Sequence, residues 1–220
     1  MKALVIALLL TVCSFSYGQT KVLKPLQHQQ QWQLLSYDDM PSNQVQFSNN
    51  RLIIDVNNSA SPLIYPLSQP LKIQTLSMSL SVDGYLNLHG KQQGEENADD
   101  FIFRIGVVYE GHKQLSGFQK LFAPEWVQSL FQLAPKNTGI NYIHFFNVYS
   151  DDRLSSTQRT HPASELIVES FAVKRSENTM QLEFQPDTNQ TILALWISSD
   201  GDNTSSHYQV TLSNLLVQTK

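Results

Sequence analysis

The chain has 220 residues, a formal net charge of −4 and one cysteine, which excludes disulfide bonds within the chain and cysteine-rich metal sites. Its 19 acidic and 15 basic residues include no run of four basic residues, which disfavours a nucleic-acid partner or an anionic membrane surface. A chain of this length fits a single β-sandwich or barrel domain.

Residues 1–18 have the organisation of a signal peptide. Lys2 gives a cationic start, residues 3–12 are apolar, and the small residues that follow suit cleavage after Gly18. The only cysteine, Cys13, lies within this segment. No later stretch approaches the roughly 18 to 20 apolar residues of a transmembrane helix. We therefore expect an exported protein, periplasmic or secreted, without a transmembrane segment.

Residues 19–31 are rich in glutamine and lack the apolar spacing that would dock them on a core, so we interpret them as a tether. A single domain is then expected at residues 32–220. Its first strand-like runs lie at residues 44–47 and 51–56. A longer run at residues 71–88 changes the parity of its apolar positions near its start, which predicts a β-bulge there.

A hydrophilic loop with four acidic residues, 91–100, leads into an apolar strand at residues 101–109. Arg104 is the one charged residue of that strand. Asp100 lies about 13 Å away along an extended chain, which is too far for a direct pair. We therefore expect Arg104 to bind a carboxylate from a neighbouring strand, for which its guanidinium is well suited.

A helix is predicted only at residues 117–133, where apolar residues follow helical spacing and Pro124 suits a first helical turn. Three further strands are predicted at residues 141–149, 165–174 and 180–184.

The last part of the chain predicts two strands and a polar loop. Residues 192–197 are apolar on both faces, as in a central strand, and residues 208–217 begin with one polar face. We expect the two runs to form a hairpin with a long loop. The whole pattern predicts a mainly β protein, an antiparallel β-sandwich resembling a jelly roll with one short helix.

Three short motifs occur in order along the chain. They are the segment 58–61 (Asn-Ser-Ala-Ser), the pair Asp99-Asp100 with Arg104, and the loop from Asp200 to Thr204. Together they resemble the DUF3047 family of exported bacterial proteins. The resemblance implies an exported β-sandwich and assigns no activity.

The standard short signatures of catalysis are missing, including Gly-x-Ser-x-Gly, His-Glu-x-x-His and the phosphate-binding loops. The mature chain would have no cysteine nucleophile, and the six histidines are too scattered to indicate a zinc site. We therefore assign no catalytic residue and favour binding without turnover.

The candidate ligand-binding residues are Asp99, Asp100, Arg104, Asp200, Asp202, Asn203 and Thr204. Converging carboxylates could hold a calcium ion, with Asp200 and Asp202 as candidate ligands, or act as the acid pair of a glycoside hydrolase. The alternative is a structural role, because Asp and Asn stabilise turns by bonding nearby amides. Aromatic residues such as Tyr65, Tyr85, Trp126, Tyr142, Tyr149 and Tyr208 could stack on sugar rings if they are exposed.

Three functions stay open. The first is a non-catalytic binding module with no cofactor other than a possible calcium ion, whose partner is an envelope glycan or an envelope protein. The second is a glycan-acting hydrolase, favoured if two carboxylates from different loops face each other in an open cleft. The third is a structural subunit of an envelope assembly, favoured by a contiguous exposed apolar patch.

Overall fold

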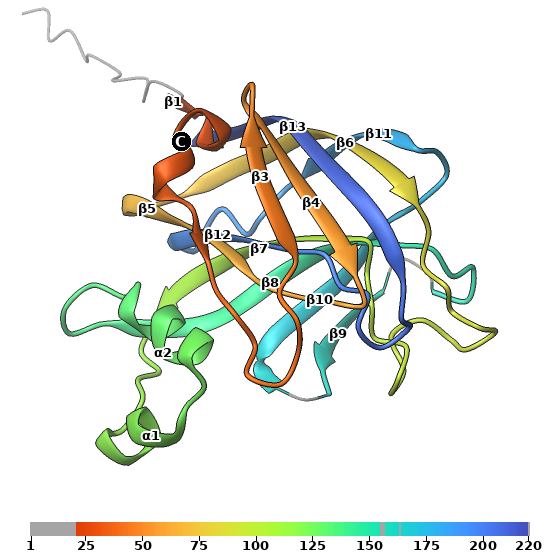
Figure 1. Cartoon of the computed structure of the whole chain (residues 1–220). Helices are drawn as coiled ribbons and strands as arrows, with labels where there is room; N and C mark the ends of the chain where they lie inside the picture. Colours follow the sequence, from red (N-terminus) through yellow and green to blue (C-terminus); the bar gives the residue numbers. More distant parts are fainter. Residues whose placement is uncertain (1–20, 155–156, 163, 220) are drawn as a thin grey trace, which may run out of the picture.

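Two β-sheets packed face to face form the body of the protein in the computed structural model shown in Figure 1. The structure describes residues 21–154, 157–162 and 164–219. The predicted signal peptide, residues 1–18, lies outside the described residues. Within them, no helix is both long enough and apolar enough to cross a bilayer.

The first sheet is antiparallel throughout. In spatial order its strands are β11 (Thr179–Phe184), β6 (Ile73–Gly84), β13 (His207–Thr219), β4 (Arg51–Asn57) and β3 (Gln44–Ser48), and β1 (Lys21–Leu23) also pairs with β13. The strand predicted at 71–88 is the shorter β6. Its predicted bulge is confirmed, because the pairing with β13 steps from Thr75 to Ile73 and so keeps Ile73 and Leu76 both buried.

The second sheet covers the other side of the core. In spatial order its strands are β2 (Gln33–Leu34), β5 (Leu63–Leu71), β12 (Ile192–Ser198), β7 (Phe103–Gly111), β8 (Gly139–Tyr149), β10 (Ser164–Lys174) and β9 (Gln158–His161). The predicted mainly β sandwich is confirmed. One pair differs from the antiparallel expectation, since β10 runs parallel to β8 after the chain has passed through the edge strand β9.

Strand β12 is buried along its whole length, as its two apolar faces predict. Leu195 and Ile197 belong to the core between the sheets. Leu193 and Trp196 face outward and are covered by helix α2 (Glu125–Gln132), whose Leu130 lies in the same apolar cluster. This second layer explains why β12 has no polar face.

The predicted helix at 117–133 is wrong as a continuous element. The structure has α1 (Gly117–Phe122) and α2, separated by Ala123 and Pro124, neither of which has helical backbone angles. A proline disfavours helical geometry in the residue before it, so the helix ends there and a new one begins after Pro124.

The predicted hairpin of the last two strands is also wrong. Strand β12 pairs with β5 and β7 in the second sheet, whereas β13 pairs with β4 and β6 in the first. The loop between them therefore crosses from one sheet to the other. Both edges of β12 are already occupied, so no edge remains for β13.

The described part of the predicted tether is packed on the sandwich. Strand β1 pairs with β13, and two short 3-10 helices follow, η1 (Pro25–Gln27) and η2 (Gln29–Gln31). Leu26 is buried in the main core, and the indole N–H of Trp32 donates to the Pro25 carbonyl at 3.2 Å. Leu23, Pro25 and Leu26 are enough to anchor the segment, and their spacing gives no periodic pattern.

Candidate functional site

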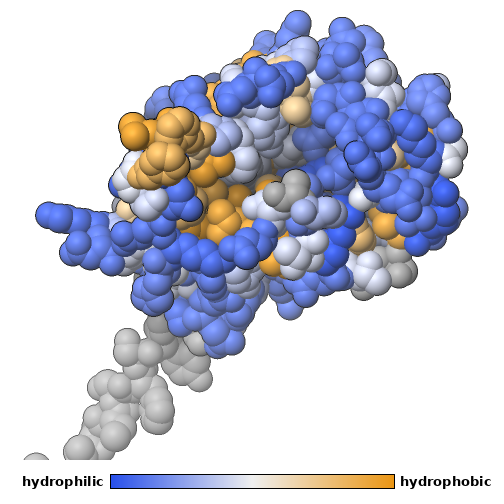
Figure 2. Space-filling view, turned by 90° about the horizontal axis from the view of Figure 1, so that it is seen from below, coloured by the Kyte–Doolittle hydropathy of each residue, from blue (hydrophilic) through white to orange (hydrophobic). Residues whose placement is uncertain are grey.

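A pocket of about 340 Å³ opens at one end of the second sheet. Strand β12 supplies Trp196 and Ser198, and the loop after it supplies Asp200, Asp202 and Asn203. Further walls come from the loop before β7, from β9, from α2 and from the segment before β3. Figure 2 shows this side of the molecule hollowed, with apolar surface inside the hollow and hydrophilic surface around it.

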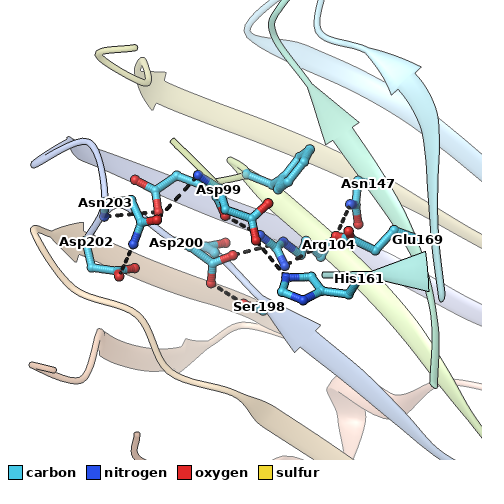
Figure 3. A network of polar contacts seen from close by, with 12 residues as sticks. Asp99, Arg104, Asn147, His161, Glu169, Ser198, Asp200, Asp202 and Asn203 are labelled. Atoms are coloured by element: carbon cyan, nitrogen blue, oxygen red, sulfur yellow. Dashed lines mark hydrogen bonds and ion pairs between the residues drawn. The ribbon is translucent and has the colours of Figure 1, made fainter. Parts of the chain in front are cut away.

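Five of the seven predicted site residues line this pocket. They are Asp99, Arg104, Asp200, Asp202 and Asn203. The two acidic loops therefore converge, although they are about a hundred positions apart in the chain. Figure 3 shows the side chains of Asp99, Arg104 and Asp200 close together, with His161 of β9 and Glu169 of β10 beside them.

The other two predicted residues, Asp100 and Thr204, lie behind the pocket and hold its loop. Asp100 Oδ2 accepts hydrogen bonds from the amide and the hydroxyl of Thr204, at 2.7 and 2.6 Å. Its Oδ1 accepts from the Asn203 amide at 3.3 Å. The turn-stabilising interpretation therefore holds for this carboxyl, whose burial raises its pKa.

Arg104 binds the carboxylate of Asp200, which follows the neighbouring strand β12, and that of Glu169 on β10, so the expected pairing with a carboxylate from elsewhere in the sheet is found. Its Nε lies 2.9 Å from Oδ2 of Asp200, an ion pair whose angle falls short of a hydrogen bond, and its Nη1 lies 3.5 Å from Oε1 of Glu169. Its Nη2 donates to the backbone carbonyl of Asp99 at 2.6 Å. The guanidinium also lies over the ring of Phe101, 4.4 Å from its centroid.

A second arginine, Arg159 on β9, joins Arg104, Asp99, Asp200 and Glu169 in a network of charged side chains, the charged floor of the pocket. Its Nε donates to Oε2 of Glu169 and its Nη2 donates to Oδ1 of Asp99, both at 2.8 Å. Glu169 is fully buried between the two guanidiniums and also accepts from the amide of Asn147 at 2.9 Å. The sequence reasoning missed these residues. Glu169 is a charged residue among the apolar residues of β10. The same pattern pointed to Arg104 on β7 and could also have pointed to Glu169.

The two pocket carboxyls Asp99 and Asp200 are shifted in opposite directions. Burial acts to raise the pKa of Asp99, but the hydrogen bond to His161, at 2.7 Å, and the charges of Arg104 and Arg159 lower it overall. Burial raises the pKa of Asp200 to about 7, although Arg104 and a hydrogen bond from the Ser198 hydroxyl oppose the shift. Asp99 is therefore ionised at neutral pH, whereas Asp200 titrates near it.

Asp99, His161 and Glu169 place ligand atoms within 4.8 Å of one another, a spacing that would suit a metal ion. Arg159 donates to both carboxylates of this group, so its guanidinium already supplies the positive charge there. These residues therefore fit an arginine better than a metal. Calcium binding by Asp200 and Asp202 stays a prediction.

One wall of the pocket is aromatic. Tyr37 meets Trp126 edge to face at 5.8 Å between ring centroids, and Trp126 meets Trp196 in the same way at 5.8 Å. Phe145 extends the series behind Trp196, at 5.9 Å. Tyr37 and Trp126 are partly exposed, and both line the pocket.

Most aromatic residues considered for sugar stacking lie elsewhere. Tyr65 and Tyr208 are buried in the main core, and Tyr85 is exposed but lies outside this pocket. Trp126 is the member of that group that lines the pocket. The sequence reasoning missed Tyr37 because it lies in an irregular segment without a period.

No protein-family model matches the chain, and no curated protein is significantly similar to it. Among solved structures it is similar to the family 11 carbohydrate-binding module of the cellulase Lic26A-Cel5E of Clostridium thermocellum, with a TM-score of 0.45 and 8% identity over 93% of this chain and 97% of that one.

It is also similar to the family 29 carbohydrate-binding module CBM29_1 of Piromyces equi, with a TM-score of 0.38 and 11% identity over 86% of this chain and 81% of that one. The xylan-binding module CBM86 of Roseburia intestinalis gives a TM-score of 0.35 and 11% identity over 92% and 96%. With similarities this low, function has to be inferred from the chain's own pocket.

Proposed function

We propose that the protein binds a carbohydrate in the pocket between the aromatic wall and the carboxylates, without turning it over. A sugar ring has apolar C–H faces that stack on aromatic rings and hydroxyl groups that donate hydrogen bonds. The observation that supports this function is the pairing of Tyr37 and Trp126 with Asp99, Asp200 and Asp202 in one pocket.

The hydrogen-bonding capacity of the pocket favours a ligand rich in donors. All three donor groups of Arg104 and of Arg159 contact protein oxygens. Among the residues that the structure describes, Oδ1 of Asp99 accepts one hydrogen bond, from Arg159, and Oδ2 makes one, with His161, so each oxygen keeps a second lone pair toward them. We therefore expect neutral sugars to bind and carboxylated or sulfated sugars to be repelled.

The size of the pocket sets the extent of contact. At about 340 Å³ it lies at the lower end of the usual range for ligand sites, roughly 300 to 1,000 Å³. We infer that one sugar unit enters and that the rest of a longer glycan stays outside.

Calorimetric titration with neutral, carboxylated and sulfated oligosaccharides tests this function. Trp126→Ala should weaken binding of the neutral ligand by about tenfold, equivalent to about 1.4 kcal/mol. Tyr85→Ala is the matched control, because this exposed aromatic residue lies outside the pocket. The proposal fails if no neutral saccharide binds the wild type, or if both variants weaken binding equally.

Glycan hydrolysis is the second candidate function. It is favoured by the opposite pKa shifts of Asp99 and Asp200 within one pocket, since such pairs divide the roles of base and acid. The ion pair between Asp200 and Arg104 favours a structural role for Asp200 instead. If the protein releases reducing ends from a bound glycan and Asp200→Asn abolishes the release, the function is hydrolysis and not binding alone. Binding without release would exclude it for that glycan.

We infer further that the protein is exported, with an envelope glycan as its ligand and a place in the DUF3047 family. The signal-peptide pattern of residues 1–18 supports export, and the three ordered motifs support the family.

A further inference from the structure

Helix α1 exposes three large apolar side chains on one face. Phe118, Leu121 and Phe122 are 74%, 76% and 72% exposed. Their spacing along a helix places them side by side, and the two phenylalanine rings lie 4.8 Å apart. The raised apolar area at the upper left of Figure 2 corresponds to the position of α1 in Figure 1.

Helix α1 is stabilised by its N-terminal cap and not by burial of its side chains. None of its residues is buried, but Ser116 and Gln119 form a complete capping box. The Gln119 amide donates to the Ser116 hydroxyl at 3.2 Å, and the Ser116 amide donates to the Gln119 side chain at 2.9 Å. The segment is therefore kept helical although it lies apart from the two sheets (Figure 1).

The size of this face argues against a protein partner or a second copy. Two phenylalanines and one leucine offer roughly 500 Å² of contact area. A stable protein interface buries about 800 Å² on each partner. A lipid surface needs no matching partner area, because a short amphipathic helix inserts its apolar side chains directly into the boundary of the bilayer.

The charge around the helix also favours a lipid surface. The whole chain carries −4, which disfavours an anionic membrane, but the charge is unevenly distributed. Helix α1 itself carries one charged side chain, Lys120, and no acidic residue, whereas Glu110, Glu125 and Glu165 offset the lysines of the neighbouring segments. Anionic headgroups attract the lysine beside the apolar face.

We propose that α1 docks the protein on an anionic lipid surface, with Phe118, Leu121 and Phe122 inserted and Lys120 at the headgroups. Helix α2 follows directly and supplies Trp126 to the pocket. Docking would therefore place the pocket close to the membrane surface. The proposal does not depend on which ligand the pocket takes.

Co-sedimentation with vesicles tests the docking. We expect the wild-type chain to bind vesicles of phosphatidylcholine mixed with phosphatidylglycerol, and the double variant Phe118→Ser/Phe122→Ser to bind about tenfold more weakly. Lys120→Glu should weaken binding to these vesicles and leave any binding to pure phosphatidylcholine unchanged. Tyr85→Ser, which removes an aromatic residue that is 72% exposed elsewhere, is the matched control and should bind as the wild type does.

Two results would overturn the proposal. The first is an absence of wild-type binding to either vesicle, or equal losses in the double variant and in Tyr85→Ser. The second is a concentration-dependent dimer in sedimentation equilibrium that the double variant abolishes while vesicles do not bind, which would assign the face to a second copy. These vesicles contain no saccharide, so neither result bears on the pocket.

Discussion

Replacing Arg104 by alanine should destabilise the protein strongly, because the side chain connects three elements at the pocket floor. The residue is 8% exposed and contacts Asp200, Glu169 and the backbone of Asp99. Its removal leaves two buried carboxyls without one of their partners and opens a space above Phe101.

The size of the loss follows from what remains. Removing one partner of a buried ion pair typically costs about 3 to 5 kcal/mol. Glu169 keeps Arg159 and Asn147 as partners, and Asp200 can reduce its own cost by taking up a proton. We therefore expect Arg104→Ala to lower the free energy of unfolding by about 3 kcal/mol at neutral pH and above, a fall in Tm of about 6 to 12 °C.

The loss should depend on pH in a defined direction. In the wild type the pKa of Asp200 is raised from 3.8 to about 7, so the folded state binds its proton more tightly than the unfolded state does. The contribution of this group to stability is present at low pH and is lost as the pH rises through about 7. Arg104 opposes the shift, so its removal raises the pKa further and extends the loss to higher pH.

Urea denaturation of both proteins at about pH 5 and about pH 8 measures this, and we expect the larger difference at the higher pH. Lys174→Ala is the control, since that residue forms an exposed ion pair with Asp152, and it should unfold as the wild type does. Equal stability of Arg104→Ala and the wild type at both pH values would refute the structural role of Arg104. A larger loss at the lower pH would refute the account of Asp200.

Three further predictions concern export, calcium and the aromatic wall. The intact mass of the exported protein should begin at Gln19, and a mature form that retains Met1 would show the signal peptide to be wrong. If Asp200 and Asp202 bind calcium, an excess of about a hundred times the Kd should stabilise the fold by about 2.7 kcal/mol over EDTA, and Asp202→Ala should abolish the shift; no shift in the wild type removes this site. Gly106→Ala should cost about 1 to 3 kcal/mol in thermal unfolding, because the new Cβ would lie 2.8 Å from the ring of Phe145, and an unchanged Tm would show that the ring moves freely.

Local sequence patterns correctly predicted which strand faces and which single residues are buried. The two apolar faces of β12 indicated a strand covered on both sides, and the change of parity near the start of β6 indicated its bulge. The lone charge of Arg104 in an apolar strand indicated a buried ion pair. Each of these inferences depends on the environment of single residues, which alternation along a strand reports directly.

Which strands pair with each other could not be predicted in the same way. The hairpin of β12 and β13 was wrong because alternation says nothing about which edge a strand meets. The helix at 117–133 was wrong because Pro124 also acts on the residue before it. Arg159 and His161 come from the edge strand β9, whose short polar run has no apolar period to mark it.

The convergence of the acidic loops is a consequence of topology. Asp99 precedes β7, Asp200 follows β12, and these neighbouring antiparallel strands bring the two ends together. The sequence showed both loops as polar and turn-forming, but their contact needed the pairing of Ser198 with Arg104.

The charged floor of the pocket and the outer residues of the aromatic wall, Tyr37 and Trp126, belong to different parts of the chain. The floor is tied into β7, β9 and β10 by bonds that lie within the protein, whereas Tyr37 and Trp126 are carried by an irregular segment and a short helix on the outside of the sheet. Substitution of Trp126 can therefore alter which ligand fits without disturbing the ion pairs that stabilise the domain. Such a division would let related sequences diversify in specificity while the sandwich stays intact, and it makes the wall the natural starting point for redesigning what the protein binds.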